Sequence, residues 1–395
     1  MDAAQTLWTT LNHYAAGLFV AGLVLAIIWN WLQWQQDRAL ALRLRTKSQQ
    51  SMPLIPRHSV RSEEPRDDNG ETLPKVSVLV AAWNEADIIR EHIQSFLGLH
   101  YPNKELILCA GGEDGTYRIA REQGHTKVKV LEQQRGEGKQ RALQRCWEQA
   151  TGEVIFLTDA DCLLDDAAFN QTLAPVLQAG EHAATGTSRP LEEQLRTPFV
   201  VYQWCTDLFV SARRPEFIAG LLGRNCALQR TPLEQIGGFA TNVPTGTDYH
   251  TAKLLLRAGY RIRYVRDSAI RTRYPATFRS YWRRQSRWVR NLLLHGLRFG
   301  AYDEVWQALR TSLAGWTMLL LPFLALAAGP LFLAIWAVLL VHALLSRLRY
   351  ARFAHLYQGI AMGGKQCLLL PLYMFVDFIA WAMPLMDLLM RRHKW

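Results

Sequence analysis

Apolar residues gather towards the two ends of this 395-residue chain, while its middle alternates short apolar and polar stretches. Residues 11–34 (LNHYAAGLFVAGLVLAIIWNWLQW) carry no charged side chain and are long enough to cross a bilayer as one helix. They do not form a secretory signal, because no positive charge precedes them and no small-residue cleavage site follows. The basic residues Arg38, Arg43, Arg45 and Lys47 come next, so the positive-inside rule predicts an external N-terminus and a cytoplasmic start for the rest.

Three more apolar stretches close the chain. Residues 312–329 and 330–345 meet at a Gly-Pro pair, which predicts the turn of a transmembrane hairpin whose basic return end (SRLRYAR) is cytoplasmic. The last stretch, residues 366–389, contains two prolines and Asp377. A single crossing there would place the basic tail RRHKW outside, so we expect a kinked, re-entrant or interfacial segment that keeps the tail inside.

The middle of the chain alternates apolar strands with helical stretches, and this order predicts a mainly parallel sheet covered on both faces. Ligands of such sheets bind outside the carboxyl ends of the strands, where the sequences WNE, GGED and DAD all fall. The expected strands are 75–82, 105–110, 127–132 and 153–157, and the expected helices are 85–99, 115–124 and 138–150.

Two acids follow the buried strand in EVIFLTDADCLLDD. Asp159 and Asp161 lie on alternate residues, an arrangement that can hold a divalent cation together with a ribose hydroxyl. The simpler explanation is that Asp often ends strands, because its side chain bonds the turning backbone. Asp165 and Asp166 are expected to form a solvated helix N-terminus.

A third acid, Asp248, stands at the head of an amphipathic helix after a loop marked by Gly and Pro, where a helix cap is the simpler explanation. His250 is either a metal ligand or a half-buried histidine at the helix start. Residues 279–300 form a basic, Trp-bearing helix, and such a helix is typical of a membrane surface.

Charge and cysteine usage narrow the class of protein. The formal net charge of +11 suits an anionic leaflet and an anionic substrate. Because the Arg clusters lie next to the apolar spans, we expect a phospholipid membrane and not nucleic acid as the partner. The six Cys have no paired spacing, so they indicate neither a disulfide framework nor a zinc site.

Taken in order, seven short motifs resemble those of the membrane-bound glycosyltransferases of family 2, which have the GT-A fold, a Rossmann-like α/β domain with a mainly parallel sheet. The resemblance covers roughly residues 75–300. The motifs are AAWNE (81–85), GEGKQRAL (136–143), TDAD (158–161), GRNCALQR (223–230), IGGF (236–239), TDYH (247–250) and RQSRW (284–288).

The resemblance implies a role for each matching residue. Asp161 would bind the Mg²⁺ or Mn²⁺ that bridges the diphosphate of a nucleotide-sugar donor, expected to be a UDP-sugar. Asp248 would be the general base. The donor-binding residues would be Asn84, Glu85, Asp114, Lys139, Asp159, Arg284, Arg287 and Trp288.

Three positions depart from the family pattern. Cys109 and Ala110 replace the usual acid pair, for which Glu113 or Asp114 would substitute, and Thr247 replaces the Glu before the base. Arg284 takes the Gln place of Gln-x-x-Arg-Trp, as in members that resemble ceramide glucosyltransferase.

One base and no enzyme nucleophile imply a single displacement with inversion. We expect transfer to a lipid or membrane-associated hydroxyl at the cytoplasmic face of a membrane, the bacterial inner membrane in our interpretation. A processive polysaccharide synthase is the main alternative, and a non-catalytic nucleotide-binding scaffold is another. Asp377 is expected either to lie near a lipid acceptor or to pair with a cation.

The expected division of the chain follows from these patterns. It consists of an N-terminal transmembrane helix (1–36), a basic juxtamembrane segment and linker (37–74), the cytoplasmic GT-A domain (75–277), amphipathic interface helices (278–311), a transmembrane hairpin (312–346), a cytoplasmic loop (347–365) and a third membrane segment with a basic tail (366–395).

Overall fold

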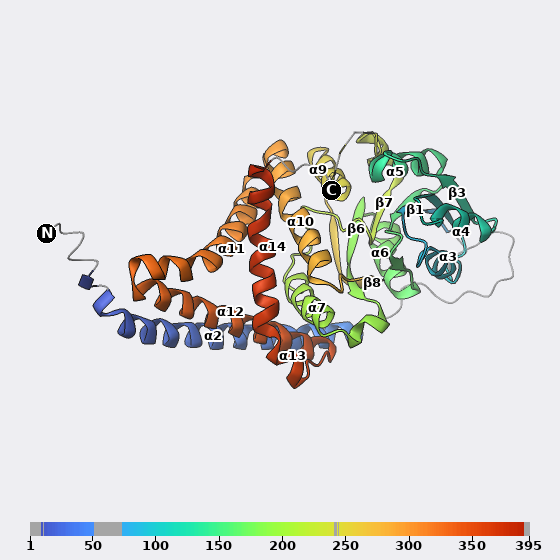
Figure 1. Ribbon diagram of the computed structural model, residues 1–395. Helices are drawn as coiled ribbons and strands as arrows, with labels where there is room; N and C mark the ends of the chain where they lie inside the picture. The colour runs from blue at the N-terminus through green and yellow to red at the C-terminus, as the bar shows by residue number, and fades with distance from the viewer. Residues whose placement is uncertain (1–8, 11, 51–72, 241–242, 244, 391–395) are drawn as a thin grey trace. The chain divides into compact units, whose positions relative to one another are not determined.

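A computed structural model describes residues 9–10, 12–50, 73–240, 243 and 245–390. The chain divides into two compact units (Figure 1). We call the first, Met1–Gln50 with Glu193–Val210 and Pro275–Trp395, the helical unit, and the second, Ser51–Glu192 with Ser211–Tyr274, the sheet unit. Most of the expected linker, residues 51–72, lies outside the described residues.

The sheet unit is built on one eight-stranded sheet of order β3-β2-β1-β4-β7-β6-β8-β5. The four strands expected from the apolar pattern form its parallel half, since β1 pairs in parallel with both β2 and β4, and β2 with β3. Their bounds are β1 Val76–Trp83, β2 Lys104–Gly111, β3 Val128–Glu132 and β4 Val154–Leu157. The carboxyl ends of these strands therefore share one edge of the sheet, as predicted.

Beyond β4 the sheet becomes mixed, which the apolar pattern did not predict. Strand β7 is antiparallel to both β4 and β6, β6 and β8 are parallel, and the two-residue β5 is antiparallel to β8. Their bounds are β5 Cys162–Leu163, β6 Ala183–Pro190, β7 Cys226–Gln229 and β8 Arg263–Thr272. This half matters for the site because β7 enters the sheet next to the strand that delivers Asp159.

Both faces of the sheet are covered, and the alternation along β1 explains why. Val76, Val78 and Val80 pack into one buried cluster, whereas Leu79 packs into another, because successive strand side chains point to opposite faces. The expected α/β class is therefore confirmed. The helices of this unit are α3 Ile89–Leu97, α4 Thr116–Glu122, α5 Gly138–Gln149, α6 Asp166–Gln178, α8 Arg230–Gln235 and α9 Thr247–Arg257.

In its described residues, the helical unit contains four helices that are long and apolar enough to cross a membrane, one at each of the apolar stretches singled out above. In Figure 1, α2 runs alongside α12, and α11 meets α12 at Gly329, the expected hairpin turn. The helices of this unit are α2 Ala15–Gln50, α7 Pro198–Ser211, α10 Phe278–Phe299, α11 Tyr302–Ala328, α12 Pro330–Gln358, α13 Gly364–Leu368 and α14 Leu370–Leu389.

Helix α2 continues well past the apolar stretch that predicted it. An ion pair between Asp37 of α2 and Arg349 of α12 (2.8 Å) ties the two helices together beyond that stretch. The Asn30 side chain of α2 also lies 3.0 Å from the His342 ring of α12 and accepts from Arg349 at 3.2 Å. Polar side chains that bond across neighbouring helices in this way stabilise helix pairs in an apolar environment.

Candidate active site

The loop after β1 is locked to the end of β2. Asn84 adopts a left-handed backbone conformation (φ 58°), which Asn tolerates better than most residues, and its Oδ1 accepts from the Glu113 amide at 2.8 Å. A Cβ on Gly112 would lie 2.2 Å from that same oxygen, so only glycine leaves room for it. The sequence predicted a helix from residue 85, but α3 begins at Ile89. The contacts above explain the difference, because they hold the first residues of that stretch in a loop.

Asp114 strengthens the same corner of the site. Its carboxylate accepts hydrogen bonds from the Ala86 amide (2.9 Å), the Thr116 amide (3.0 Å) and the Thr116 hydroxyl (2.6 Å). Burial alone would raise the pKa of Asp114, but these donors outweigh it and lower the pKa. The side chain therefore acts first as the link between the β1 loop and α4, and its donor-binding role stays a prediction.

Asp159 lies beyond the end of β4 between two cations. Its carboxylate pairs with the Lys139 ammonium at the start of α5 and lies 3.8 Å from Nε of Arg224. The negative charges of Asp159 and Asp161 raise the pKa of Arg224 despite its burial. Arg224 is not among the predicted site residues, although it belongs to the motif GRNCALQR. It lies beside Asp159 because β7, the strand that follows it, pairs with β4.

Negative charge is concentrated where Glu85, Asp159 and Asp161 converge. Partial burial, followed by the neighbouring charge of Asp161, raises the pKa of Glu85 from its ordinary value of 4.5 to about 7. Among the described residues, no cation forms an ion pair with Asp161, whose side chain is half-buried. The closeness of Glu85 and Asp161, with no basic side chain paired to Asp161, suits a bound divalent cation.

The donor atoms at this point have the right chemistry for Mg²⁺ or Mn²⁺, because both prefer carboxylate oxygens. The described part of the chain holds no group of three His, Cys, Asp or Glu side chains that could enclose an ion. A full protein cage is not required, since Mg²⁺ is commonly held by one or two carboxylates together with substrate phosphates. The residues present therefore fit the expected ion.

Asp248 is in the first turn of α9, as predicted, but it is not the helix cap. The cap position belongs to Gly246, while Oδ2 of Asp248 faces the Gly223 amide at 3.4 Å. A Cβ on Gly223 would lie 2.8 Å from the Cβ of Asp248, closer than real Cβ atoms come, so glycine is needed for this approach. His250, two residues on, is buried and not half-buried, and no metal-binding group among the described residues includes it.

Lys139 pairs with Asp159 and also lies in the electrostatic field of Asp248, the expected base. Partial burial would lower its pKa, but the charges of Asp159 and Asp248 outweigh it and raise the pKa. The sheet unit thus brings together six of the predicted site residues, namely Asn84, Glu85, Lys139, Asp159, Asp161 and Asp248, with Asp114 in the supporting loop.

The remaining predicted residues lie on α10 of the helical unit. Arg284 donates to Oε1 of Gln203 at 3.0 Å, and its guanidinium lies 5.0 Å from the centre of the Trp288 ring. Arg287 is exposed, and no described carboxylate lies within ion-pair distance of it. Arg284 therefore links α10 to α7 and contacts Trp288 of its own helix, whereas the side chain of Arg287 is exposed. Their roles in donor binding stay predictions.

Asp377, the acid inside the last apolar stretch, is fully buried within the helical unit and has three partners. Arg347 of α12 lies 2.8 Å from its Oδ2, the hydroxyl of Tyr281 of α10 donates to its Oδ1 at 2.5 Å, and the hydroxyl of Tyr202 of α7 donates to Oδ2. Burial and the charge of Asp377 raise the pKa of both tyrosines, so both stay protonated and donate. Of the two expectations for Asp377, pairing with a cation is the one observed.

Relatives of the chain are found among curated bacterial proteins. A protein of Bacillus subtilis (strain 168) described as "Probable glycosyltransferase YdaM" is 28% identical over 240 residues, covering 56% of each chain. A poly-beta-1,6-N-acetyl-D-glucosamine synthase of Staphylococcus epidermidis is 25% identical over 221 residues, covering 54% of this chain and 53% of that one. The chain thus spans about half the length of the curated relatives it matches.

A solved structure also resembles the chain over most of its length. The mannosyltransferase PcManGT from Pyrobaculum calidifontis, in complex with GDP-Man and Mn²⁺, is 20% identical with a TM-score of 0.49, covering 95% of this chain and 99% of that one. At that TM-score the likeness supports no inference about the present chain. The family model described as "Glycosyltransferase like family 2" matches residues 74–291, more than half of the 395 residues. The mixed α/β sheet agrees with the expected GT-A class, and the chain belongs to glycosyltransferase family 2.

Proposed function

We propose that the chain is an inverting, metal-dependent glycosyltransferase that moves a sugar from a nucleotide-sugar, expected to be a UDP-sugar, to a hydroxyl of a lipid or membrane-associated acceptor. The observation that carries this proposal is the convergence of Glu85, Asp159 and Asp161 at the carboxyl edge of the sheet, with Lys139 paired to Asp159 and influenced by the charge of Asp248.

Different side chains would hold different parts of the donor. Asp161 would hold Mg²⁺ or Mn²⁺, and a bound ion would neutralise the negative charge that develops on the leaving diphosphate. Lys139 and Arg224 hold the carboxylate of Asp159 in place. That carboxylate would accept a hydrogen bond from a nucleoside hydroxyl of the donor. Arg287, exposed and without an ion-pair partner among the described residues, is available for the diphosphate.

Asp248 would act as the general base. A hydroxyl is a weak nucleophile and needs a carboxylate within hydrogen-bond reach to accept its proton. The close approach to Gly223 fixes the position of the Asp248 side chain. Because the proposal uses one base and no covalent enzyme nucleophile, the anomeric centre inverts, and an α-linked donor gives a β-linked product.

The acceptor is proposed to be a lipid because four helices among the described residues are long and apolar enough to cross a membrane. On the positive-inside rule we propose that the sheet unit lies in the cytoplasm and that the membrane is the bacterial inner membrane. One observation favours a second function: relatives at about 25% identity are named as polysaccharide synthases, so processive transfer is the alternative to a single transfer.

The proposal is tested by supplying the purified full chain with UDP-, GDP- and dTDP-sugars, lipid extract and either Mn²⁺ or a chelator. We expect transfer from one donor, loss of transfer with chelator, and a single glycosylated lipid. A ladder of polymer lengths would favour the processive alternative. No turnover of any donor with any metal would contradict the proposed activity.

Asp248→Asn sharpens this test, because it removes the base while keeping the size of the side chain. We expect transfer to fall by at least about 10²-fold, the lower range for losing a general base. Binding of UDP, measured by calorimetry, should stay within a few fold of the wild type. Asp267→Asn, at an exposed position of β8, is the control and should leave transfer unchanged. Unchanged turnover in Asp248→Asn would remove Asp248 from the mechanism.

A further inference from the structure

We propose that Asp165 is a positioning residue for Asp161: together with Arg189 and Arg271 it fixes the short segment that follows the metal-binding carboxylate. The proposal rests on the proposed function, because it takes Asp161 as the metal ligand. It assigns a role to a carboxylate for which the sequence predicts only a solvated helix N-terminus.

The segment after Asp161 has little sheet structure of its own. Strand β5 has only two residues, Cys162 and Leu163, and pairs with β8 alone at the edge of the sheet. One further backbone bond, from the Arg273 amide to the Asp161 carbonyl at 3.1 Å, continues this pairing. So short a ladder on an edge strand depends on neighbouring side chains to hold its position.

Helix α3 supplies two of those contacts. The buried His92 ring bonds the Cys162 carbonyl through Nδ1 at 2.7 Å, and the hydroxyl of Ser95 accepts from the Leu164 amide at 3.0 Å. Burial lowers the pKa of His92, so the ring is neutral and Nδ1 carries the donating hydrogen. The segment is therefore fixed on the side that faces α3.

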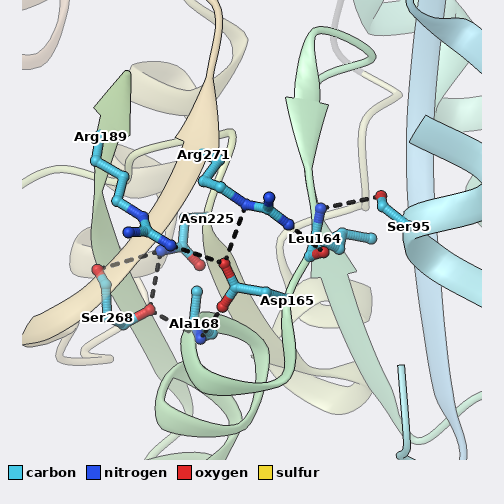
Figure 2. A network of polar contacts seen from close by, with 8 residues as sticks. All are labelled: Ser95, Leu164, Asp165, Ala168, Arg189, Asn225, Ser268 and Arg271. Atoms are coloured by element: carbon cyan, nitrogen blue, oxygen red, sulfur yellow. Dashed lines mark hydrogen bonds and ion pairs between the residues drawn. The ribbon is translucent and has the colours of Figure 1, made fainter. Parts of the chain in front are cut away.

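Asp165 fixes the opposite side, as Figure 2 shows. Its Oδ1 accepts from the Ala168 amide at 2.9 Å as the N-cap of α6, and its Oδ2 lies 3.4 Å from both Nη2 of Arg189 and Nε of Arg271. Arg271 also donates to the Leu164 carbonyl at 3.4 Å. The same guanidinium thus contacts the carboxylate and the backbone of the segment.

The charges explain why a carboxylate is required at residue 165. Arg189 and Arg271 are register partners on the neighbouring strands β6 and β8, so their guanidinium groups come together on one side of the sheet. One carboxylate between them offsets their mutual repulsion. Without that charge, the two cations repel each other, and Arg271 loses the anchor that aims it at the Leu164 carbonyl.

Asp161 is sensitive to this support because no ion pair holds its own carboxylate among the described residues. Its direction is therefore set by the backbone that precedes and follows it and by a weak hydrogen bond from the Cys162 thiol of the same segment to its Oδ1 (3.6 Å). Groups that orient a metal ligand without touching the metal commonly change metal affinity by 10–100-fold when altered. A similar change is expected here.

The test compares Asp165→Asn with Asp166→Asn in the full chain. Asn keeps an oxygen for the N-cap of α6 but removes the charge that faces both arginines. Asp166 is adjacent on the same helix and pairs with the exposed His100 at 2.6 Å, so Asp166→Asn is the matched control. The readout is Mn²⁺ affinity in the presence of UDP, measured by the paramagnetic resonance signal of free Mn²⁺, with the unfolding midpoint of the metal-free protein measured beside it.

We expect Asp165→Asn to weaken Mn²⁺ binding by about tenfold, and Asp166→Asn to bind as the wild type does. Adding Arg189→Gln to Asp165→Asn removes one of the two uncompensated cations, so the double variant should bind Mn²⁺ more tightly than Asp165→Asn alone. A role of Asp165 limited to capping α6 predicts no such rescue.

Wild-type affinity in Asp165→Asn would overturn the positioning role and leave the proposed function standing. If Asp165→Asn fails to fold, Arg271→Gln alone decides the question, since it keeps the cap and removes the guanidinium that contacts both Asp165 and the Leu164 carbonyl; unchanged affinity in that variant overturns the proposal. A wild type that binds no Mn²⁺ with UDP would overturn the proposed metal dependence and this inference together.

Discussion

Two carboxylates, one in each unit, differ in whether side chains of the protein bind their oxygens. Asp377 of the helical unit is buried, and its oxygens are occupied by Arg347 and the hydroxyls of two tyrosines. Asp161 of the sheet unit is half-buried, lies near Glu85 and has no ion-pair partner among the described residues. From sequence alone, both were conspicuous acids at the end of, or inside, an apolar run.

The difference lies in whether the protein itself supplies the compensating charge. A buried charge is tolerated when it is paired and hydrogen-bonded, and Asp377 meets both conditions within its own unit. Asp161 has no ion pair of its own among the described residues and only the longer-range charge of Arg224 beside it, which suits a carboxylate that binds a cation from outside the chain. We therefore interpret Asp377 as a structural anchor of α7, α10, α12 and α14, and Asp161 as a ligand-binding group.

The largest effect on stability is expected from Asp377→Asn. This substitution leaves Arg347 buried without its counter-charge, and breaking a buried pair in this way costs about 3–5 kcal/mol of the free energy of unfolding. Denaturation of the purified chain in detergent measures the loss. The double variant Asp377→Leu/Arg347→Met removes both charges and should recover most of the stability. A single variant as stable as the wild type would show that Asp377 is not the anchor we describe.

A smaller effect is expected from Glu105, a third carboxylate whose partners lie within the sheet unit. Burial alone would raise its pKa, but donors from Lys75, Ser77 and Thr151 lower it from 4.5 to about 2. Because the folded pKa is the lower one, the stabilisation is present above pH 4.5 and is lost as the pH falls towards 2.

Glu105→Gln should therefore flatten the loss of stability across that pH window, measured by denaturant unfolding at successive pH values. Glu91→Gln, at an exposed position of α3, is the control and should keep the wild-type slope. If stability falls equally steeply with pH in the wild type and in Glu105→Gln, the hydrogen-bond donors around Glu105 do not lower its pKa as described. That result would weaken the contrast between Asp377 and Asp161.

The sequence predicted the parallel half of the sheet well because its strands are short apolar runs between helices. It did not predict the mixed half, since β6 (AATGTSRP) and β8 (RYVRDSAIRT) are rich in polar residues and lack clear alternation. β5 is too short to produce any pattern. The sequence therefore did not predict Arg189 and Arg271 as neighbours of Asp165, because these residues belong to β6 and β8.

Long-range pairing also explains what was missed in the site. Arg224 lies beside Asp159 only because β7 enters the sheet next to β4. Arg347, the cation that pairs with Asp377, is thirty residues away on another helix. The sequence could therefore not identify it and left two expectations for Asp377. By contrast, Asp248 was placed correctly because a local signal, an acid after a loop that opens an amphipathic helix, determines its position.

Asp161 is proposed to hold the divalent ion of the donor diphosphate. The most direct test of this role is the anomalous signal of Mn²⁺ in crystals of the full chain soaked with MnCl₂ and UDP, compared with the same soak of Asp161→Asn. We predict a Mn²⁺ peak within bonding distance of the Asp161 carboxylate in the wild type and no peak there in the variant. UDP bound in the wild type with no ion beside Asp161, or an ion retained in place in Asp161→Asn, would contradict the account.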